Sequence, residues 1–189
     1  MRDELKMLNF CPVIKKLLPL ILALATTSAA FGQSIARPSV PDQLAAPSGN
    51  EVVLVAHASG SQIYNCQAGA DGKYSWVLKG PEAELRDQQG AVIGHHFAGP
   101  TWKHGDGSEV TGKVEAKVNS PDSGSVPWLL LSATGHSGGG VLSGVTFIQR
   151  TNTKGGQSPP AAACNAAQQN VEIKSSYTAD YYFYAPEHR

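Results

Sequence analysis

The chain has 189 residues with 15 basic and 15 acidic side chains, so its formal net charge at neutral pH is zero. It has no basic stripe of the kind that nucleic acid requires, and we expect no nucleic-acid partner. The 20 glycines and 12 prolines favour a chain of short strands and turns over a helical protein.

Residues 1–32 have the three regions of a cleavable secretory signal. Lys15 and Lys16 precede a short apolar run, Leu17–Ala25, and small residues follow at Thr26–Ala30. The apolar run is much shorter than the ~20 residues that span a bilayer, so we expect no stable membrane insertion after cleavage. The sequence therefore predicts a secreted or periplasmic protein.

Residues 33–50 are expected to form an extended, proline-rich lead-in, and residues 51–189 a single all-β domain. After the lead-in, apolar residues recur with a period of two, which is typical of strands. Strands are expected at Glu51–Ala58, Gln62–Gln67, Lys73–Leu78, Val92–Phe97, 110–118, Trp128–Thr134, Gly144–Arg150 and Val171–Ala185. Turns are expected at Ser59-Gly60, Asp106-Gly107 and Lys154-Gly155-Gly156, with one helical turn at Glu82–Leu85 and two at Ala161–Gln169. The fold expected is a single-domain antiparallel β-sandwich or small barrel with one disulfide and little helix.

The last strand carries an apolar stripe that includes Tyr177, Tyr181 and Phe183. Tyr182 and Tyr184 fall on its opposite face, where they either cap the sheet against another layer or form an exposed aromatic patch. An exposed patch of that kind would bind carbohydrate or protein.

Two cysteines remain once the signal is removed, because Cys11 lies inside it. Cys66 and Cys164 lack the paired spacing of a zinc site. An exported chain with an even number of thiols favours a long-range disulfide between them. The alternative is two unpaired, buried thiols.

The densest group of polar and aromatic residues lies between Gly94 and Glu109. His96, His104 and Asp106 could form a metal or acid–base site across the turn. The alternative is one histidine in the core, others in solvent, and an Asp-Gly turn. We favour that alternative and expect no metal and no cofactor.

Gly135–Gly139 matches the G-x-S-x-G pattern of serine hydrolases, with Ser137 at the nucleophile position. That mechanism needs a helix directly after the serine, whereas Gly140 and a β-branched stretch follow. We interpret the segment as a flexible glycine hairpin.

Several ordered segments resemble a family of secreted bacterial and fungal proteins, the domain of unknown function 3455. The segments include Ala58–Cys66, His96–Trp102 and Tyr177–Tyr184, and the resemblance extends from about Pro41 to Ala185. The family pattern has a cysteine at each of the two mature positions, which agrees with the disulfide. The resemblance implies class and compartment but no activity.

We therefore expect a disulfide-stabilised, exported all-β domain with a non-catalytic binding or structural role. Its partner would be an unknown small molecule, a glycan or a surface component. The candidate ligand-binding residues are Tyr64, His96, Trp102, Asp106 and Arg150, and we expect them to converge on one pocket. The alternative function is a metal-dependent or acid–base enzyme centred on His96, Trp102, His104, Asp106 and Glu109.

Overall fold

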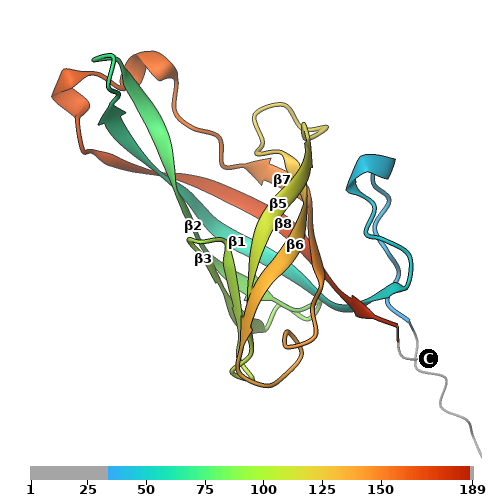
Figure 1. The fold of residues 1–189 in the computed structure, drawn as a ribbon. Coiled ribbons are helices and arrows are strands. Elements are labelled where there is room, and N and C mark those ends of the chain that lie inside the picture. The colour runs from blue at the N-terminus through green and yellow to red at the C-terminus, as the bar shows by residue number, and fades with distance from the viewer. Residues whose placement is uncertain (1–33, 188–189) are drawn as a thin grey trace, which may run out of the picture. The chain divides into compact units, whose positions relative to one another are not determined.

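The computed structural model describes residues 34–187, which form one closed barrel of eight antiparallel strands (Figure 1). Each strand is hydrogen-bonded to the next along the chain, and the last strand returns to pair with the first. The strands are β1 (Asn50–Ala68), β2 (Tyr74–Arg86), β3 (Val92–Phe97), β4 (Thr101–His104), β5 (Glu109–Val118), β6 (Trp128–Ser137), β7 (Phe147–Gly155) and β8 (Glu172–Pro186). The all-β class is confirmed, and the sheet closes as a barrel instead of splitting into a sandwich.

Helical structure within residues 34–187 is limited to three short 3-10 turns, η1 (Asp42–Leu44), η2 (Ala161–Ala163) and η3 (Ala166–Gln168). None of the helices in this part of the chain is long and apolar enough to cross a membrane. The expected secretory signal, residues 1–32, lies outside the described residues.

The β1 strand runs without interruption through Ser59-Gly60, so the turn expected there is wrong. A Cβ atom on Gly60 would lie 2.2 Å from the carbonyl oxygen of Glu82 and 2.5 Å from the Cα atom of Ala83. The glycine is thus required because β2 crosses close to β1, which is a common reason for glycine inside a strand.

The helical turn expected at Glu82–Leu85 is also wrong, because this stretch lies within β2. Its side chains alternate, with Ala83 and Leu85 buried and Glu82 and Glu84 exposed. A period of two is the period of a strand, and here it prevails over the helix propensity of Glu and Ala.

The barrel interior is filled by aromatic and aliphatic side chains from opposite walls. Trp102 on β4 makes edge-to-face contacts with Tyr181 and Phe183 on β8. Leu131 on β6 and Ile148 on β7 are buried in the same cluster. The apolar stripe predicted on the last strand therefore faces the lumen.

A second apolar cluster covers the outside of the barrel. The lead-in places Leu44, at the end of η1, against Val52 of β1, Leu130 of β6 and Tyr184 of β8. Tyr184 is 1 % exposed, and its hydroxyl donates to Oε1 of Gln149. Of the two alternatives for the outward tyrosines, Tyr184 thus caps the sheet against another layer.

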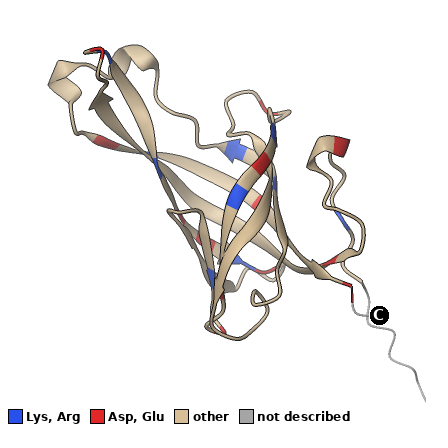
Figure 2. Cartoon of the chain, in the orientation of Figure 1, with Lys and Arg blue, Asp and Glu red and all other residues tan. Residues whose placement is uncertain are grey.

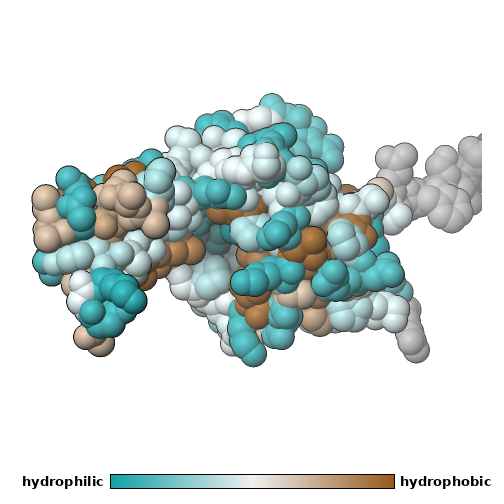
Figure 3. Space-filling model, turned by 90° about the horizontal axis from the view of Figure 1, so that it is seen from above, coloured by the Kyte–Doolittle hydropathy of each residue, from teal (hydrophilic) through white to brown (hydrophobic). Residues whose placement is uncertain are grey.

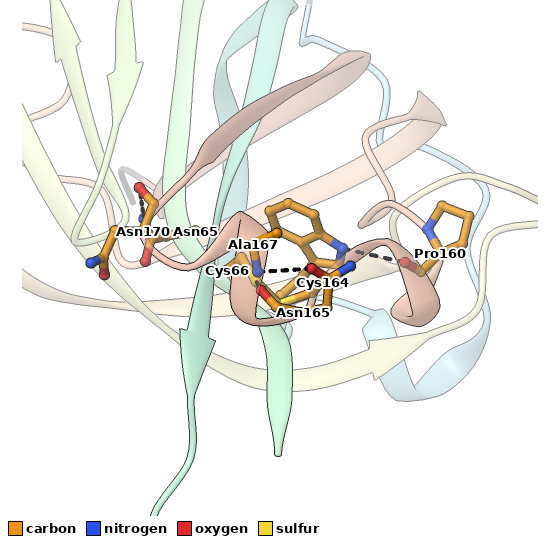
Figure 4. The surroundings of a disulfide bond; sticks show 8 residues. Asn65, Cys66, Pro160, Cys164, Asn165, Ala167 and Asn170 are labelled. Atoms are coloured by element: carbon orange, nitrogen blue, oxygen red, sulfur yellow. Dashed lines mark hydrogen bonds between the residues drawn. A yellow bond between two sulfur atoms is a disulfide. The ribbon is translucent and has the colours of Figure 1, made fainter. Parts of the chain in front are cut away.

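The predicted disulfide joins Cys66 at the far end of β1 to Cys164 after η2 (Figure 4). Their Cα atoms are 5.5 Å apart, and the closed loop spans 98 residues. The backbone of Cys66 also forms two hydrogen bonds with the β7–β8 connection: its N–H donates to the carbonyl oxygen of Val171, and its carbonyl oxygen accepts from the N–H of Asn170. The connection between the last two strands is thereby fastened to the β1–β2 hairpin.

Candidate functional site

A cavity of about 300 Å³ opens into the barrel lumen, and all eight strands contribute to its lining. The apolar part of the lining includes Leu78, Pro81, Val114, Leu129 and Leu131, and the polar or aromatic part is Gln62, Lys79, His96, Trp102, Arg150 and Tyr181. Leu78 and Val114 are 52 % and 43 % exposed and lie where the cavity meets solvent. Figure 3 looks down on this end of the barrel and shows apolar surface interspersed with hydrophilic side chains. An eight-stranded barrel is just wide enough for such a site.

Three of the five candidate residues line this cavity: His96, Trp102 and Arg150. Tyr64 and Asp106 do not. Tyr64 is buried on β1, and its hydroxyl donates to the carbonyl oxygen of Gly156 at 2.8 Å. Because that hydroxyl is already engaged, Tyr64 fastens the start of the β7–β8 connection to the barrel wall.

His96 and Trp102 form a stacked pair across β3 and β4, with ring centroids 4.4 Å apart. His96 Nδ1 lies 2.8 Å from the carbonyl oxygen of Thr101. A carbonyl can only accept, so Nδ1 carries the proton and Nε2 is left as an acceptor. Burial lowers the pKa of His96 to about 3, and the ring is therefore neutral at physiological pH.

Arg150 is the positively charged side chain that lies deepest in the lining without a carboxylate partner among residues 34–187. Its Nε and Nη2 groups donate to the carbonyl oxygen of Pro127 at 3.1 and 2.8 Å, which fixes the orientation of the guanidinium. The side chain forms no ion pair with a carboxylate of residues 34–187. Its remaining N–H donors lie beside the Tyr181 hydroxyl and the cavity.

Other polar groups around Arg150 are buried without a hydrogen-bond partner. They are Gln62 Nε2, Trp102 Nε1 and the hydroxyls of Tyr177 and Tyr181. Burial raises the pKa of Tyr181, and the positive charge of Arg150 opposes this rise. The Tyr177 hydroxyl nevertheless lies within hydrogen-bonding reach of Tyr181 and Gln62, and the Tyr181 hydroxyl lies within reach of Arg150. Trp102 Nε1 has no partner in this group, and a buried, unpaired donor costs about 1–3 kcal/mol.

Sequence reasoning missed the cavity residues Gln62 and Tyr181 and their buried neighbour Tyr177. Both tyrosines belong to the apolar stripe of the last strand and were interpreted as core. The signal that could have identified Gln62 is its parity, because it shares the inward face of β1 with Ala56 and Ala58. A polar residue on an inward face calls for a partner.

In a comparison with known protein families, residues 47–185 match the protein family of unknown function DUF3455. This chain belongs to that family. The DUF3455 match includes both disulfide cysteines and every strand of the barrel except the last residue of β8, so the lumen cavity is part of the family domain. No curated protein and no solved structure matches the chain.

Asp106 has a structural position at the opposite end of the DUF3455 barrel. Its carboxylate accepts hydrogen bonds from the hydroxyl and backbone amide of Ser108 and from the backbone amide of Val141. The Ser108 hydroxyl and these amides hold the pKa of Asp106 well below its usual range. The carboxylate thereby joins the β4–β5 turn to the β6–β7 loop, whose Leu142 is fully buried.

The set His96, His104 and Asp106 does not assemble into a metal site. His104 Nδ1 lies 3.1 Å from an Asp106 carboxylate oxygen in the turn, whereas His96 is stacked on Trp102. Among residues 34–187, no three His, Cys, Asp or Glu side chains lie close enough together to hold a metal ion. Glu109, also in the alternative enzyme site, begins β5 at the same end as the turn.

Ser137 is the last residue of β6 and is followed by a turn, not by a helix. The neighbouring His136 donates from Nε2 to the carbonyl oxygen of Val145 at 2.7 Å. Asp180, the acid that a hydrolase triad would use, lies 2.6 Å from His57 Nδ1. The glycine hairpin interpretation of this motif therefore agrees with the structure, although the strand reaches further into it than expected.

Proposed function

We propose that this protein binds one small organic molecule inside the barrel, without catalysis, at the cell envelope or outside the cell. The observation that carries the proposal is the lumen cavity of about 300 Å³. Its size is at the lower end of known ligand sites, which are mostly apolar with a few convergent polar groups. The lumen cavity has this composition, because its walls are mostly apolar and Gln62, His96 and Arg150 are among its few polar side chains.

The protonation chemistry of the cavity supports binding over catalysis. A general acid or base works best when its pKa lies near the operating pH. Burial lowers the pKa of His96 to about 3, and it raises the pKa of Tyr181 above its ordinary value. Arg150 stays protonated, and the lining contributed by residues 34–187 includes no Asp or Glu. These cavity groups therefore keep one protonation state near pH 7.

A small molecule is favoured over a glycan or a surface component as the partner. Gln62, Trp102 and Tyr181 line the lumen cavity, where only a molecule that enters the barrel can reach them. Basic and acidic residues are spread along the strands without a large region of one sign (Figure 2). A glycan would also leave its hydroxyl groups against the apolar walls formed by Leu129 and Leu131.

Two features support an exported location. Residues 1–32 have the pattern of a secretory signal, and the Cys66–Cys164 disulfide is the kind of bond that persists in an oxidising compartment.

Fragment binding to matched variants tests the proposal. Val114 lines the cavity and is 43 % exposed, whereas Val77 is 41 % exposed on β2 and lies outside the cavity lining. We expect Val114→Trp to fill the mouth and Val77→Trp to leave it open, with little effect of either on folding. Ligand-observed NMR with a library of small aromatic and aliphatic fragments would measure binding.

The proposal expects fragments that bind the unmodified protein and Val77→Trp but fail to bind Val114→Trp. If the same fragments bind all three proteins equally, they do not use the lumen, and the proposed function is wrong. Circular dichroism of each variant shows that a loss of binding does not come from unfolding.

A further inference from the structure

The cavity lining contains two cations, and only one of them is neutralised. Lys79 Nζ lies 2.5 Å from a carboxylate oxygen of Glu172 on the exposed rim. Arg150 is half-buried and forms no ion pair with any carboxylate of the described chain. A cation withdrawn from water is costly unless an opposite charge and further hydrogen bonds compensate it.

The groups that surround this cation include several hydrogen-bond donors. Arg150 and Tyr181 are directly opposite each other in the β7–β8 register. Trp102 Nε1 and Gln62 Nε2 can only donate; the indole N–H is buried without a partner, whereas the amide has the Tyr177 hydroxyl beside it. A site with one positive charge and several donors is complementary to a group that is negative and rich in acceptors.

The charge balance favours a single negative charge on the ligand. Arg150 is the one cation in the described lining without a carboxylate partner. A dianionic phosphate would leave an uncompensated negative charge beside the apolar walls, which is unfavourable. A carboxylate matches both the charge and the planar fork of a guanidinium.

The apolar walls indicate what the rest of the ligand must be. Leu131 and Trp102 line the interior, and Val114, Leu129 and Leu78 continue the apolar surface toward the mouth. These side chains offer no hydrogen bonds except from the Trp102 indole N–H, so the body of the ligand has to be apolar and compact.

We propose that the barrel binds a small monocarboxylate with an apolar or aromatic body, its carboxylate paired with Arg150 and its body directed toward the mouth. This inference rests on the proposed lumen binding and adds the chemical class of the ligand. The Tyr181 hydroxyl and Gln62 Nε2 donate the additional hydrogen bonds.

Matched acids and amides test the inference. Benzoate, phenylacetate, 3-phenylpropionate and hexanoate would be compared with their primary amides by calorimetry or NMR titration. The amides keep the shape of each acid but remove its charge. We expect the acids to bind at least about tenfold more tightly than the amides, as a difference of one charge-assisted contact implies.

Substitutions of Arg150 test its role. Arg150→Met should abolish the preference for acids over amides, and Arg150→Lys should retain part of it because the charge remains. Lys103→Met is the matched control, since Lys103 is exposed on β4 and is absent from the lining. We expect it to bind the acids as the unmodified protein does. Thermal unfolding of each variant reports whether the fold is retained.

The possible failures are distinguishable. If amides bind as tightly as acids, or if Arg150→Met keeps the preference, the ligand class is wrong while lumen binding stands. If inorganic phosphate or sulfate displaces the acids at a concentration similar to that of the acids, the site recognises anions in general. The proposal of a carboxylate with an apolar body is then wrong. If neither acids, amides nor the fragment library bind, both the inference and the proposed function fail.

Discussion

His96 and Arg150 lie in the same lumen, but burial affects their charges in opposite ways. The imidazole loses its charge because desolvation lowers the pKa of His96 to about 3. A guanidinium cannot be deprotonated in a protein, so Arg150 keeps its charge and is oriented by the carbonyl of Pro127. The cavity therefore combines one fixed positive charge with a neutral aromatic stack.

The buried histidine makes stability depend on pH. The unfolded His96 takes up a proton near pH 6.5, whereas the folded one does so only near pH 3. Its contribution is therefore complete above pH 6.5 and is lost as the pH falls from 6.5 toward 3. We expect His96→Phe to reduce this loss, by at most roughly 5 kcal/mol, in urea unfolding measured across that range. His95→Phe, an exposed neighbour, should leave the pH dependence unchanged, and an unchanged slope in His96→Phe would contradict the assignment.

The site residues that sequence reasoning found were those with distinctive chemistry. His96, Trp102 and Arg150 stand out by type and do line the cavity. Asp106 stands out equally, but it lies on a turn, and the direction of a turn side chain follows from tertiary packing that a strand period does not describe. Tyr181 was hidden for the opposite reason, because a tyrosine within an apolar stripe has the same pattern as a core residue.

At the scale of elements, the close crossing of β1 and β2 depends on a residue with no side chain. The sequence predicts a turn at Ser59-Gly60, because glycine is frequent in turns. The closeness of Glu82 and Ala83 requires the glycine for space. Its neighbours on β1 pair with both β2 and β8, so this position is held from two sides and has little freedom to move.

A methyl group at this crossing should be costly. We expect Gly60→Ala to lower the free energy of unfolding by about 1–3 kcal/mol, because the new Cβ would overlap the β2 backbone. Gly139→Ala is the matched control, since a Cβ there meets no heavy atom within 4 Å. Urea denaturation of both variants measures the difference. Equal stabilities would show that the two strands can separate at Gly60 without penalty.

At the scale of the whole domain, the strand pattern predicted the class but could not decide between a sandwich and a barrel. Both need amphipathic strands with one buried face. The decision depends on β1 pairing with β8, whose residues are more than 100 positions away, as in His57 with Asp180. Such a pairing has no local signature. The cysteine count did give a long-range contact correctly, because it rests on covalent chemistry.

The disulfide should act on both stability and the cavity. Replacing Cys66 and Cys164 with serine should lower the free energy of unfolding by about 2–4 kcal/mol. It should also weaken acid binding, because Leu78 of the mouth lies on the β2 segment paired with the end of β1. Leu44→Ala in the outer cluster should lose a similar stability, about 2–5 kcal/mol, without weakening binding. If both variants lose affinity equally, the effect on binding is general loosening and not a local effect of the disulfide.

The positions of the two cysteines also bear on what happens when the backbone is cut. The six strands from β2 to β7 all lie between Cys66 and Cys164. A protease that cleaves once anywhere in this interval leaves two fragments that are still covalently joined. These fragments are also held by the ladder between β1 and β8, which lies outside the interval. Nicking of a surface turn is therefore not enough to release a piece of the barrel, and separation of the fragments requires a reductant as well as a denaturant.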